Sequence, residues 1–381
     1  MVLEPQPLMR IRQALPDDNP RILDFQARHA MRGSLPMRFD RAPDYFALHR
    51  CHGPFHEVWC AEDEHGALKG IASLVVRDGY LEGAARPVAY IGDLRLMPDR
   101  RLSREWMGVV RDRLATLRSE AGVEHAYCCM IRDNRLAVQS LVQSRRASRL
   151  RFAHWRGYEN ISVYARRGLW DANRVPAGVR IVEAQPHHAD VLRAFLDAQS
   201  RRQPFGCVFS EQEFARRLDT WPAFGIGSFL LAFDVRGRLV GCVAPWDASA
   251  IKRIVLERLP LSLRAVRAVF NGLAPLLRRP RIAAPGEPLG DVYLTHLQVR
   301  ERDPAIFAAL IDAAWARLRH QHALIQLCLY DDDPLWAAMG RYRHASTPMD
   351  LYTLPTGDAD AEVPADISPA GPIPGFEIYL V

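Results

Sequence analysis

The sequence predicts an α/β (α+β) protein made of two tandem domains, each a mixed, mostly antiparallel sheet flanked by helices. Three observations carry this prediction. The chain has 381 residues, about twice the usual length of a single domain. Short strands alternate with amphipathic helices, which is typical of sheets covered by helices. The order of these elements also recurs in the second half of the chain.

The repeat is visible as three pairs of matching segments. They are Met9–Pro16 with Val179–Pro186, Val58–Gly66 with Phe229–Gly237, and Tyr90–Leu96 with Tyr293–Val299. The first pair predicts a strand that runs into a helix, and the second predicts the turn of a hairpin. The offset is 170 or 171 for these two pairs and 203 for the third. The second half therefore contains about 32 extra residues before its fourth strand, counted from these offsets.

Residues 250–281 fill that interval. We expect helices over 251–259 and 262–277, separated near Pro260. The segment carries eight basic residues and one acid, Glu257, with apolar residues at helical spacing. Such a segment covers an acceptor site, engages a partner or contacts an anionic surface. The simplest interpretation is a lid that packs on its own domain.

These observations set the domain boundaries. We expect a first domain over 8–168, a linker over 169–178 and a second domain over 179–355 with the helical insert 250–281. The tail 356–381 is rich in proline and alanine, so we expect it to be extended or loose. It closes with Phe376–Val381, which is apolar enough to dock as an edge strand.

One stretch of the first half resembles the GNAT acyltransferase superfamily. The resemblance is carried by Tyr90-Ile-Gly-Asp-Leu-Arg-Leu-Met-Pro-Asp-Arg-Arg101 with the helix after it, and by Asp133-Asn134-Arg-Leu-Ala137. The element order matches over about 10–167 and more faintly over about 179–354. The resemblance implies a tandem GNAT protein that transfers an acyl group from acyl-coenzyme A to an amine, as an N-acetyltransferase does.

The resemblance also implies where the cofactor, acetyl-CoA or another acyl-CoA, would bind. The fourth strand separates from the fifth and leaves backbone groups for the pantetheine, and the next helix offers its first N–H groups to the pyrophosphate. The implied cofactor-binding residues are Leu94, Leu96, Arg101, Leu102, Ser103, Arg104 and Asn134. Arg145, Arg146 and Arg149 would meet the 3′-phosphate, unless they simply belong to an arginine-rich solvated surface.

The pyrophosphate motif departs from the family pattern, which is Arg/Gln-x-x-Gly-x-Gly/Ala. Here the register places Arg104 and Trp106 at the two glycine positions. Arginine supplies charge, whereas the indole of Trp106 would block the groove. The second-half counterpart contains Glu301 and Asp303, which repel phosphate. We therefore expect the first half to retain any cofactor site and the second to have little or none.

Acyl transfer needs a base and an acid. Asp93 is the candidate base, and its alternative role is a structural ion pair with Arg95 or Arg77. His296 occupies the matching place in the second half, where we interpret it as a core histidine. The position of the family's acidic tyrosine holds Leu141, and Tyr158 and Tyr164 are its possible replacements, unless they are packing residues; we take Tyr158 as the candidate acid.

Composition limits the other possibilities. The seven cysteines form no zinc pattern, so we expect reduced thiols, no metal and a cytoplasmic location. No apolar run could span a bilayer, so we expect no membrane partner. We expect a small-molecule amine as the acceptor and no nucleic-acid partner. The sequence is compatible with a homo-oligomer. The alternatives are a catalytically silent tandem module that binds a small molecule or protein, and an enzyme that uses charged transfer RNA.

Overall fold

The computed structural model describes residues 9–29, 36–135, 138–139, 150, 152–167, 175–356 and 364–380. Within them, twelve strands form one continuous sheet in the order β1-β3-β4-β5-β6-β14-β7-β13-β12-β10-β9-β8. The first-half strands are β1 (Arg10–Gln13), β3 (Phe55–Glu62), β4 (Leu68–Leu81), β5 (Ala84–Leu96), β6 (His125–Ile131) and β7 (Ala153–Arg166). The second-half strands are β8 (Arg180–Glu183), β9 (Leu230–Phe233), β10 (Leu239–Trp246), β12 (Asp291–Val299), β13 (Leu324–Tyr330) and β14 (Tyr342–Pro355).

The helices complete the repeat. The first half contains α1 (Asn19–Arg28), α2 (Ala47–His52) and α3 (Arg100–Ala121), and the second contains α5 (Ala189–Ser200), α6 (Glu211–Thr220), α8 (Pro304–Leu318) and α9 (Trp336–Met339). In both halves, antiparallel strands precede a long helix and a parallel strand. The prediction of a mixed, mostly antiparallel sheet flanked by helices is confirmed.

Each long helix is held to its sheet by one apolar face. Leu114 and Leu117 of α3 are buried in a cluster with Leu74 and Ala89 of the sheet. Phe307 and Leu310 of α8 are buried in the corresponding cluster of the second half. Residues three and four apart lie on one side of a helix, so this spacing positions each helix against its sheet.

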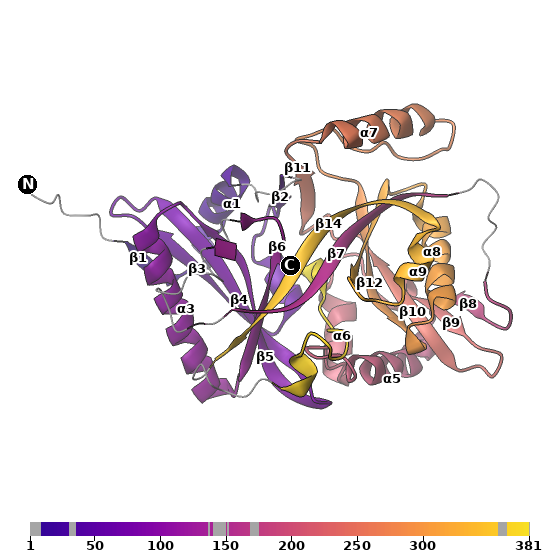
Figure 1. Cartoon of the computed structure of the whole chain (residues 1–381), viewed down its shortest axis with the longest axis horizontal. Coiled ribbons are helices and arrows are strands. Elements are labelled where there is room, and N and C mark those ends of the chain that lie inside the picture. Colours follow the sequence, from indigo (N-terminus) through magenta and orange to yellow (C-terminus); the bar gives the residue numbers. More distant parts are fainter. Residues whose placement is uncertain are drawn as a thin grey trace, which may run out of the picture.

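The last strand of each half lies in the other half of the sheet. β14 pairs with β6, from Met349 opposite Ile131 to Pro355 opposite His125. β7 pairs with β13, with Tyr158 opposite Tyr330. β7 and β14 also pair with each other along most of their length and cross the centre of the molecule (Figure 1). Because neither half completes its sheet alone, we expect the two halves to unfold together.

The insert differs from the expected helix pair. Residues 253–256 form strand β11 (Arg253–Leu256), which pairs with β2 (Met37–Asp40) of the first half in a separate two-stranded sheet. The prediction of a helix over 251–259 is therefore wrong, because the edge of β2 offers Ile254 and Val255 backbone partners that a helix could not use. The second expected helix is present as α7 (Leu261–Leu273).

The end of the chain also differs from the prediction. Phe376, Ile378, Tyr379 and Leu380 are buried, and Ile378–Leu380 forms a turn of 3-10 helix rather than an edge strand. Figure 1 shows this segment at the centre of the molecule, between the halves. Aromatic and charged side chains of both halves surround it and take the place of strand pairing, as detailed below.

The described residues show neither a membrane-spanning helix nor a metal cluster. None of their helices is long and apolar enough to cross a membrane. They contain no group of three or more metal-ligating side chains placed to hold an ion. All seven cysteines are free thiols.

Candidate functional site

β5 and β6 separate soon after they begin to pair. The parallel pairing consists of Ala89 opposite Ala126 and Tyr90 opposite Tyr127. Beyond this point β5 continues beside β4 as far as Leu96, and β6 continues beside β14 as far as Ile131. The facing edges of β5 and β6 therefore have backbone groups without strand partners. The second half repeats this geometry, because β12 and β13 pair only from Asp291 to Tyr293 of β12.

A bulge follows at the same place in both halves. Asp93 of β5 has φ of 55° and His296 of β12 has φ of 49°, values that non-glycine residues rarely adopt. The pairing register shifts beside each of them, in β4 and in β10. We call the region between the separated strands of each half its cleft. The bulge therefore turns each side chain out of its regular alternation beside the cleft.

Asp93 lies in a cluster of donors that the sequence did not reveal. Arg41 donates to its two carboxylate oxygens at 2.7 and 3.1 Å, and Tyr45 donates at 3.0 Å. His49 Nε2 lies 3.2 Å from Oδ2, and Arg95 lies 3.7 Å from Oδ1. Burial by itself would raise the pKa of Asp93, but Arg41 and His49 outweigh burial and hold the pKa well below its usual range. Asp93 is therefore ionised and strongly paired, with Arg41 rather than Arg77 as its main partner.

Tyr158 lies at the apex of the cleft. Its side chain is fully buried, and the one side-chain group that its hydroxyl contacts among the described residues is the weakly hydrogen-bonding thiol of Cys129. The thiol of Cys129 lies nearby and is 3.2 Å from the hydroxyl of Tyr90. Burial raises the pKa of Tyr158 well above its usual value, so the hydroxyl keeps its proton at neutral pH. The structure thus leaves a buried hydroxyl donor available where the strands separate.

The start of α3 is capped by its own chain. The carboxylate of Asp99 accepts the backbone N–H groups of Arg101 and Leu102 at 2.7 and 3.0 Å. Asp303 caps α8 in the same way. The amides expected to bind a pyrophosphate are therefore already satisfied, and a phosphate would have to displace Asp99.

The side chains of the implied cofactor residues have different surroundings. Leu102 is fully buried beside Trp106, whose indole packs on Ala61 and Ala72 of the sheet. Ser103 donates to the Asp99 carbonyl at 2.8 Å. Arg101 pairs with Glu105 at 2.7 Å, and Arg104 is exposed and forms no ion pair with any described residue.

The remaining implied positions are Leu94 and Leu96 on the β5 edge and Asn134 beyond β6. Leu94 and Leu96 are half-buried beside the Trp106 cluster. Asn134 is half-buried, and its N–H bonds to the Ile131 carbonyl at 3.0 Å. Leu141, Arg145, Arg146 and Arg149 lie outside the described residues.

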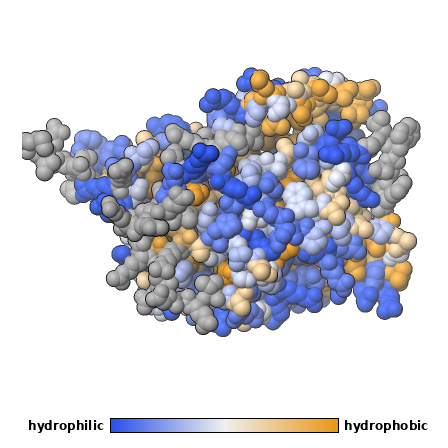
Figure 2. All heavy atoms as spheres, viewed as in Figure 1, coloured by the Kyte–Doolittle hydropathy of each residue, from blue (hydrophilic) through white to orange (hydrophobic). Residues whose placement is uncertain are grey.

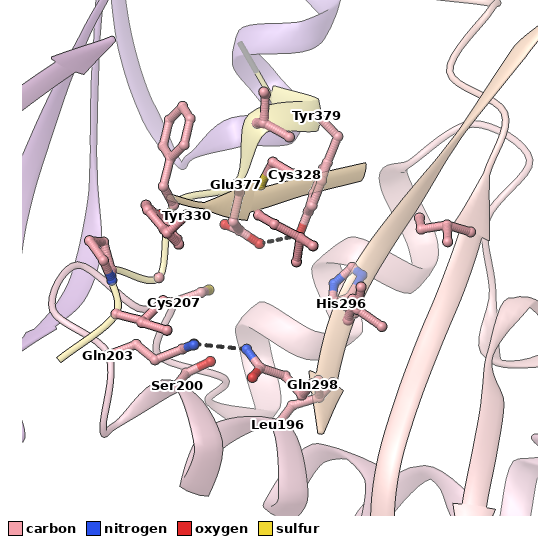
Figure 3. A pocket seen from close by; sticks show the side chains of 18 of the residues that line it. Leu196, Ser200, Gln203, Cys207, His296, Gln298, Cys328, Tyr330, Glu377 and Tyr379 are labelled. Carbon is pink, nitrogen blue, oxygen red and sulfur yellow. Dashed lines mark hydrogen bonds between the residues drawn. The ribbon is translucent and has the colours of Figure 1, made fainter. Parts of the chain in front are cut away.

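The tail fills the matching cleft of the second half (Figure 3). A cavity of about 90 Å³ remains between β12, β13 and residues 373–379. Arg217 donates to Glu377 at 2.6 and 2.9 Å, and the Tyr379 hydroxyl donates to Glu377 at 2.6 Å. His296 lies 3.1 Å from Arg217 and 2.9 Å from the Thr295 hydroxyl. Burial, with the Arg217 charge, lowers the pKa of His296 to about 3, so it is a neutral core histidine.

A second hollow opens on the first half, beside α2 and β3. Its volume is about 470 Å³, and its lining includes Asp44, Arg50 and His56. The His56 ring stacks on the His49 ring with centroids 5.9 Å apart, and His49 in turn contacts Asp93. Burial lowers the pKa of His56, so its imidazole is neutral at pH 7. A line of side chains thus connects this hollow to the bulge in β5.

Sequence reasoning missed Lys252 as well. Its ammonium lies 4.7 Å from the centre of the Phe39 ring and 4.8 Å from that of Tyr293. Burial lowers the pKa of Lys252 to about 7 and raises that of Asp291 nearby to about 7. One sequence signal could have pointed to it, because Lys252 is one of two lysines among 50 basic residues.

The splayed strands, the duplicated bulges and the long helices define the class of protein: the chain has the GNAT fold. No family model and no curated protein matches the sequence. A solved structure of Saccharomyces cerevisiae N-myristoyltransferase with bound myristoyl-CoA and inhibitors is 12% identical, with a TM-score of 0.57 over 92% of this chain and 82% of its own. The GCN5-related N-acetyltransferase from Sphaerobacter thermophilus is 13% identical, with a TM-score of 0.50 over 93% and 97%.

A third similar structure contains the GCN5-related glucosamine N-acetyltransferase region of a fungal multi-domain GH3 beta-N-acetylglucosaminidase. It is 10% identical, with a TM-score of 0.57 over 92% of this chain and 38% of that chain. At these identities the likeness establishes the fold, and the activity has to be argued from the site.

Proposed function

We propose that the protein is an acyltransferase that moves an acyl group, most simply acetyl, from acyl-CoA to a small-molecule amine. The observation that carries the proposal is the first-half cleft, where β5 and β6 leave facing edges unpaired beside a buried hydroxyl, that of Tyr158. Residues 373–379 occupy most of the matching cleft of the second half, whereas only Phe376 of this segment contacts Tyr90 and Tyr127 of the first half, which supports the first half as the cofactor site. The seven free thiols support a reducing compartment such as the cytoplasm.

Aromatic side chains at the apex of the cleft support a short acyl group. The Phe376 ring lies 6.1 Å from that of Tyr90, 6.2 Å from that of Tyr127 and 5.5 Å from that of Tyr158. All four residues are buried. A long chain would have to displace this cluster, whereas an acetyl group would not.

The proposed proton route runs from the hollow beside α2. His56 is half-buried at the hollow and neutral, so it is suited to accept a proton from an acceptor amine. Behind it, His49 contacts the ionised Asp93, which favours the protonated form of His49, although burial outweighs this and lowers the pKa of His49. We assign Asp93 to this charge-stabilising role because its low pKa makes it a weak base. Tyr158 is the proposed donor to the departing thiolate, because its raised pKa keeps it protonated.

Calorimetric titration with acetyl-CoA, combined with an assay of free thiol release, tests the proposal. Arg104→Glu should weaken acetyl-CoA binding by about tenfold or more, because it reverses an unpaired charge beside the proposed pyrophosphate site. Arg118→Glu is the matched control, since it makes the same change on an exposed residue at the far end of α3. Equal affinities for the two variants, or no binding at millimolar acetyl-CoA, would contradict the site.

One observation favours the alternative function, a catalytically silent tandem module that binds a small molecule or protein. Asp99 already occupies the first amides of α3, as expected of a helix that binds no phosphate. In this alternative the cleft binds a different molecule and no thiol is released from any acyl-CoA. Thermal stabilisation by an amine in the absence of acetyl-CoA affinity would support it.

A further inference from the structure

The insert between β10 and β12 presents a helix that stands away from the body of the protein. β11 anchors the insert, with Arg253 paired to Asp40 at 2.8 Å and Glu257 to Arg38 at 2.9 Å. α7 begins after Pro260 and lies outside the sheet and its flanking helices (Figure 1). None of its residues is buried. α7 is therefore packed on the body only in part, through half-buried residues such as Leu263.

The side chains of α7 divide between two sides of the helix. On the inner side Leu263 is half-buried and packs against the core. Polar side chains bind the returning chain: Arg267 donates to the Ala283 carbonyl at 2.9 Å, and Asn271 exchanges two hydrogen bonds with Ile282 at 2.8 and 2.9 Å. Other apolar side chains of α7 and of the turn after it are exposed, and they form a patch that we name the α7 face. Its members, with their exposed fractions, are Leu261 (81%), Val269 (64%), Leu273 (48%), Leu276 (81%) and Leu277 (48%). Figure 2 shows the hydrophobic colour gathered over α7.

Such a patch costs free energy in water unless something covers it. Five large apolar side chains exposed along one helix and the turn that follows it are unusual for a soluble surface and mark an interaction site. The far end of the insert is fastened to the body, because Arg279 donates to the Tyr164 and Ala323 carbonyls at 2.6 and 3.0 Å and stacks over Trp315. The α7 face is therefore held in an outward orientation at both ends.

The charges around the α7 face indicate what kind of surface would bind it. Arg258, Arg264, Arg278 and Arg281 are exposed around the α7 face, and none forms an ion pair within the described residues. The one acid of the insert, Glu257, is already paired with Arg38. An apolar strip flanked by arginines matches the interface of an anionic bilayer, where acyl chains receive the leucines and lipid phosphates receive the guanidinium groups. Nucleic acid would leave the leucines in water.

We propose that the α7 face binds the surface of membranes that contain anionic lipids, with α7 lying in the plane of the interface. This binding is peripheral, and it revises the sequence-based expectation that the chain has no membrane partner. It does not depend on the proposed acyl transfer, because α7 contributes no residue to the cleft between β5 and β6.

Flotation of the full chain with lipid vesicles tests the proposal. The vesicles contain phosphatidylcholine alone or with about 30 mol% phosphatidylglycerol. We expect binding to the anionic vesicles, at least about tenfold weaker binding to the neutral ones, and release at about 0.5 M NaCl. The double variant Leu261→Asp/Leu276→Asp should lose at least about tenfold in affinity. Both sites are highly exposed, so the variant should keep its melting temperature.

Two further variants keep the test specific. Val235→Asp makes the same change at a side chain that is 80% exposed in the hairpin between β9 and β10, and it should bind normally. Arg278→Gln/Arg281→Gln should remove the preference for phosphatidylglycerol while the leucines remain.

The proposal is overturned if neither vesicle binds, or if the leucine double variant binds like the unmodified chain. Sedimentation velocity tests the competing explanation, that a second copy of the chain covers the α7 face. If the chain forms a dimer that Leu261→Asp/Leu276→Asp dissociates, and vesicles are not bound, a second copy of the chain covers the α7 face and the membrane proposal is wrong.

Discussion

Glu377 joins the tail to both halves, and its neutralisation should destabilise the whole protein. Its carboxylate receives two hydrogen bonds from Arg217 and one from Tyr379, and Arg77 of the first half lies 4.0 Å away. The Arg217 side chain is 0% exposed and that of Glu377 is 9% exposed. In Glu377→Gln the shape of the side chain remains, but the buried guanidinium loses its closest counter-charge.

The size of the effect follows from this burial. Removing one partner of a buried ion pair costs about 3–5 kcal/mol, because the other charge stays buried. Arg217 keeps a second carboxylate, Glu213, at 2.7 Å. We therefore expect the lower end of the range, about 3 kcal/mol of unfolding free energy. Denaturant unfolding, followed by circular dichroism and by tryptophan fluorescence, measures this loss.

An exposed ion pair supplies the control. Glu183 is 61% exposed and lies 3.7 Å from Arg317, so Glu183→Gln should cost less than about 1 kcal/mol. The reasoning is refuted if Glu377→Gln costs no more than Glu183→Gln. That result would mean that solvent screens the Glu377–Arg217 pair and that the tail is held by its apolar contacts alone.

The pH dependence gives an independent check on the same pair. Burial by itself would raise the pKa of Glu377, but Arg217 outweighs it and holds the pKa far below the usual range. A lowered pKa in the folded state stabilises the protein above the unfolded-state pKa, about 4.3, and this stabilisation is lost as the pH falls. The difference in stability between the unmodified chain and Glu377→Gln should therefore be largest above about pH 5 and shrink in more acidic buffers.

Three further predictions concern the proposed acyl transfer. Asp99→Asn keeps the helix cap but removes a negative charge beside the proposed pyrophosphate site, so calorimetry should show acetyl-CoA binding about fivefold tighter; an unchanged Kd would argue against that site. Tyr158→Phe should lower kcat by about 100-fold or more with little change in KM, while unfolding free energy changes by less than about 1 kcal/mol because the hydroxyl contacts only a weakly hydrogen-bonding thiol. His56→Gln should lower kcat/KM. For the unmodified chain, kcat/KM should fall only in buffers more acidic than the ordinary histidine pKa, because burial lowers the pKa of His56, and a profile that is the same in His56→Gln would exclude this base.

Local patterns predicted the repeated elements well. The segments Val179–Pro186 and Tyr293–Val299 contain β8 and most of β12, as their first-half counterparts contain β1 and the end of β5. The apolar run Leu324–Tyr330 coincides with β13. These elements depend on alternation and helical spacing, which neighbouring residues carry by themselves.

Long-range contacts account for the differences. Residues 253–256 pair with β2, more than 200 positions earlier, and Glu377 meets Arg217 across 160 positions. The local sequence pattern of either segment does not predict which distant residues it contacts. The same holds for Asp93, whose donors Arg41, Tyr45 and His49 approach from α2 and the chain before it.

The sequence by itself determined the duplicated order of elements and the apolar spacing of each helix, because these are properties of neighbouring residues. Only the tertiary structure decided which half receives each last strand, that the tail occupies the second cleft, and that the leucines of the α7 face point outward. Each of these outcomes depends on free energy shared between distant segments, such as a strand edge, a buried ion pair or a polar contact with the returning chain. The local sequence pattern shows that a segment can form such contacts, but it does not show with which distant segment.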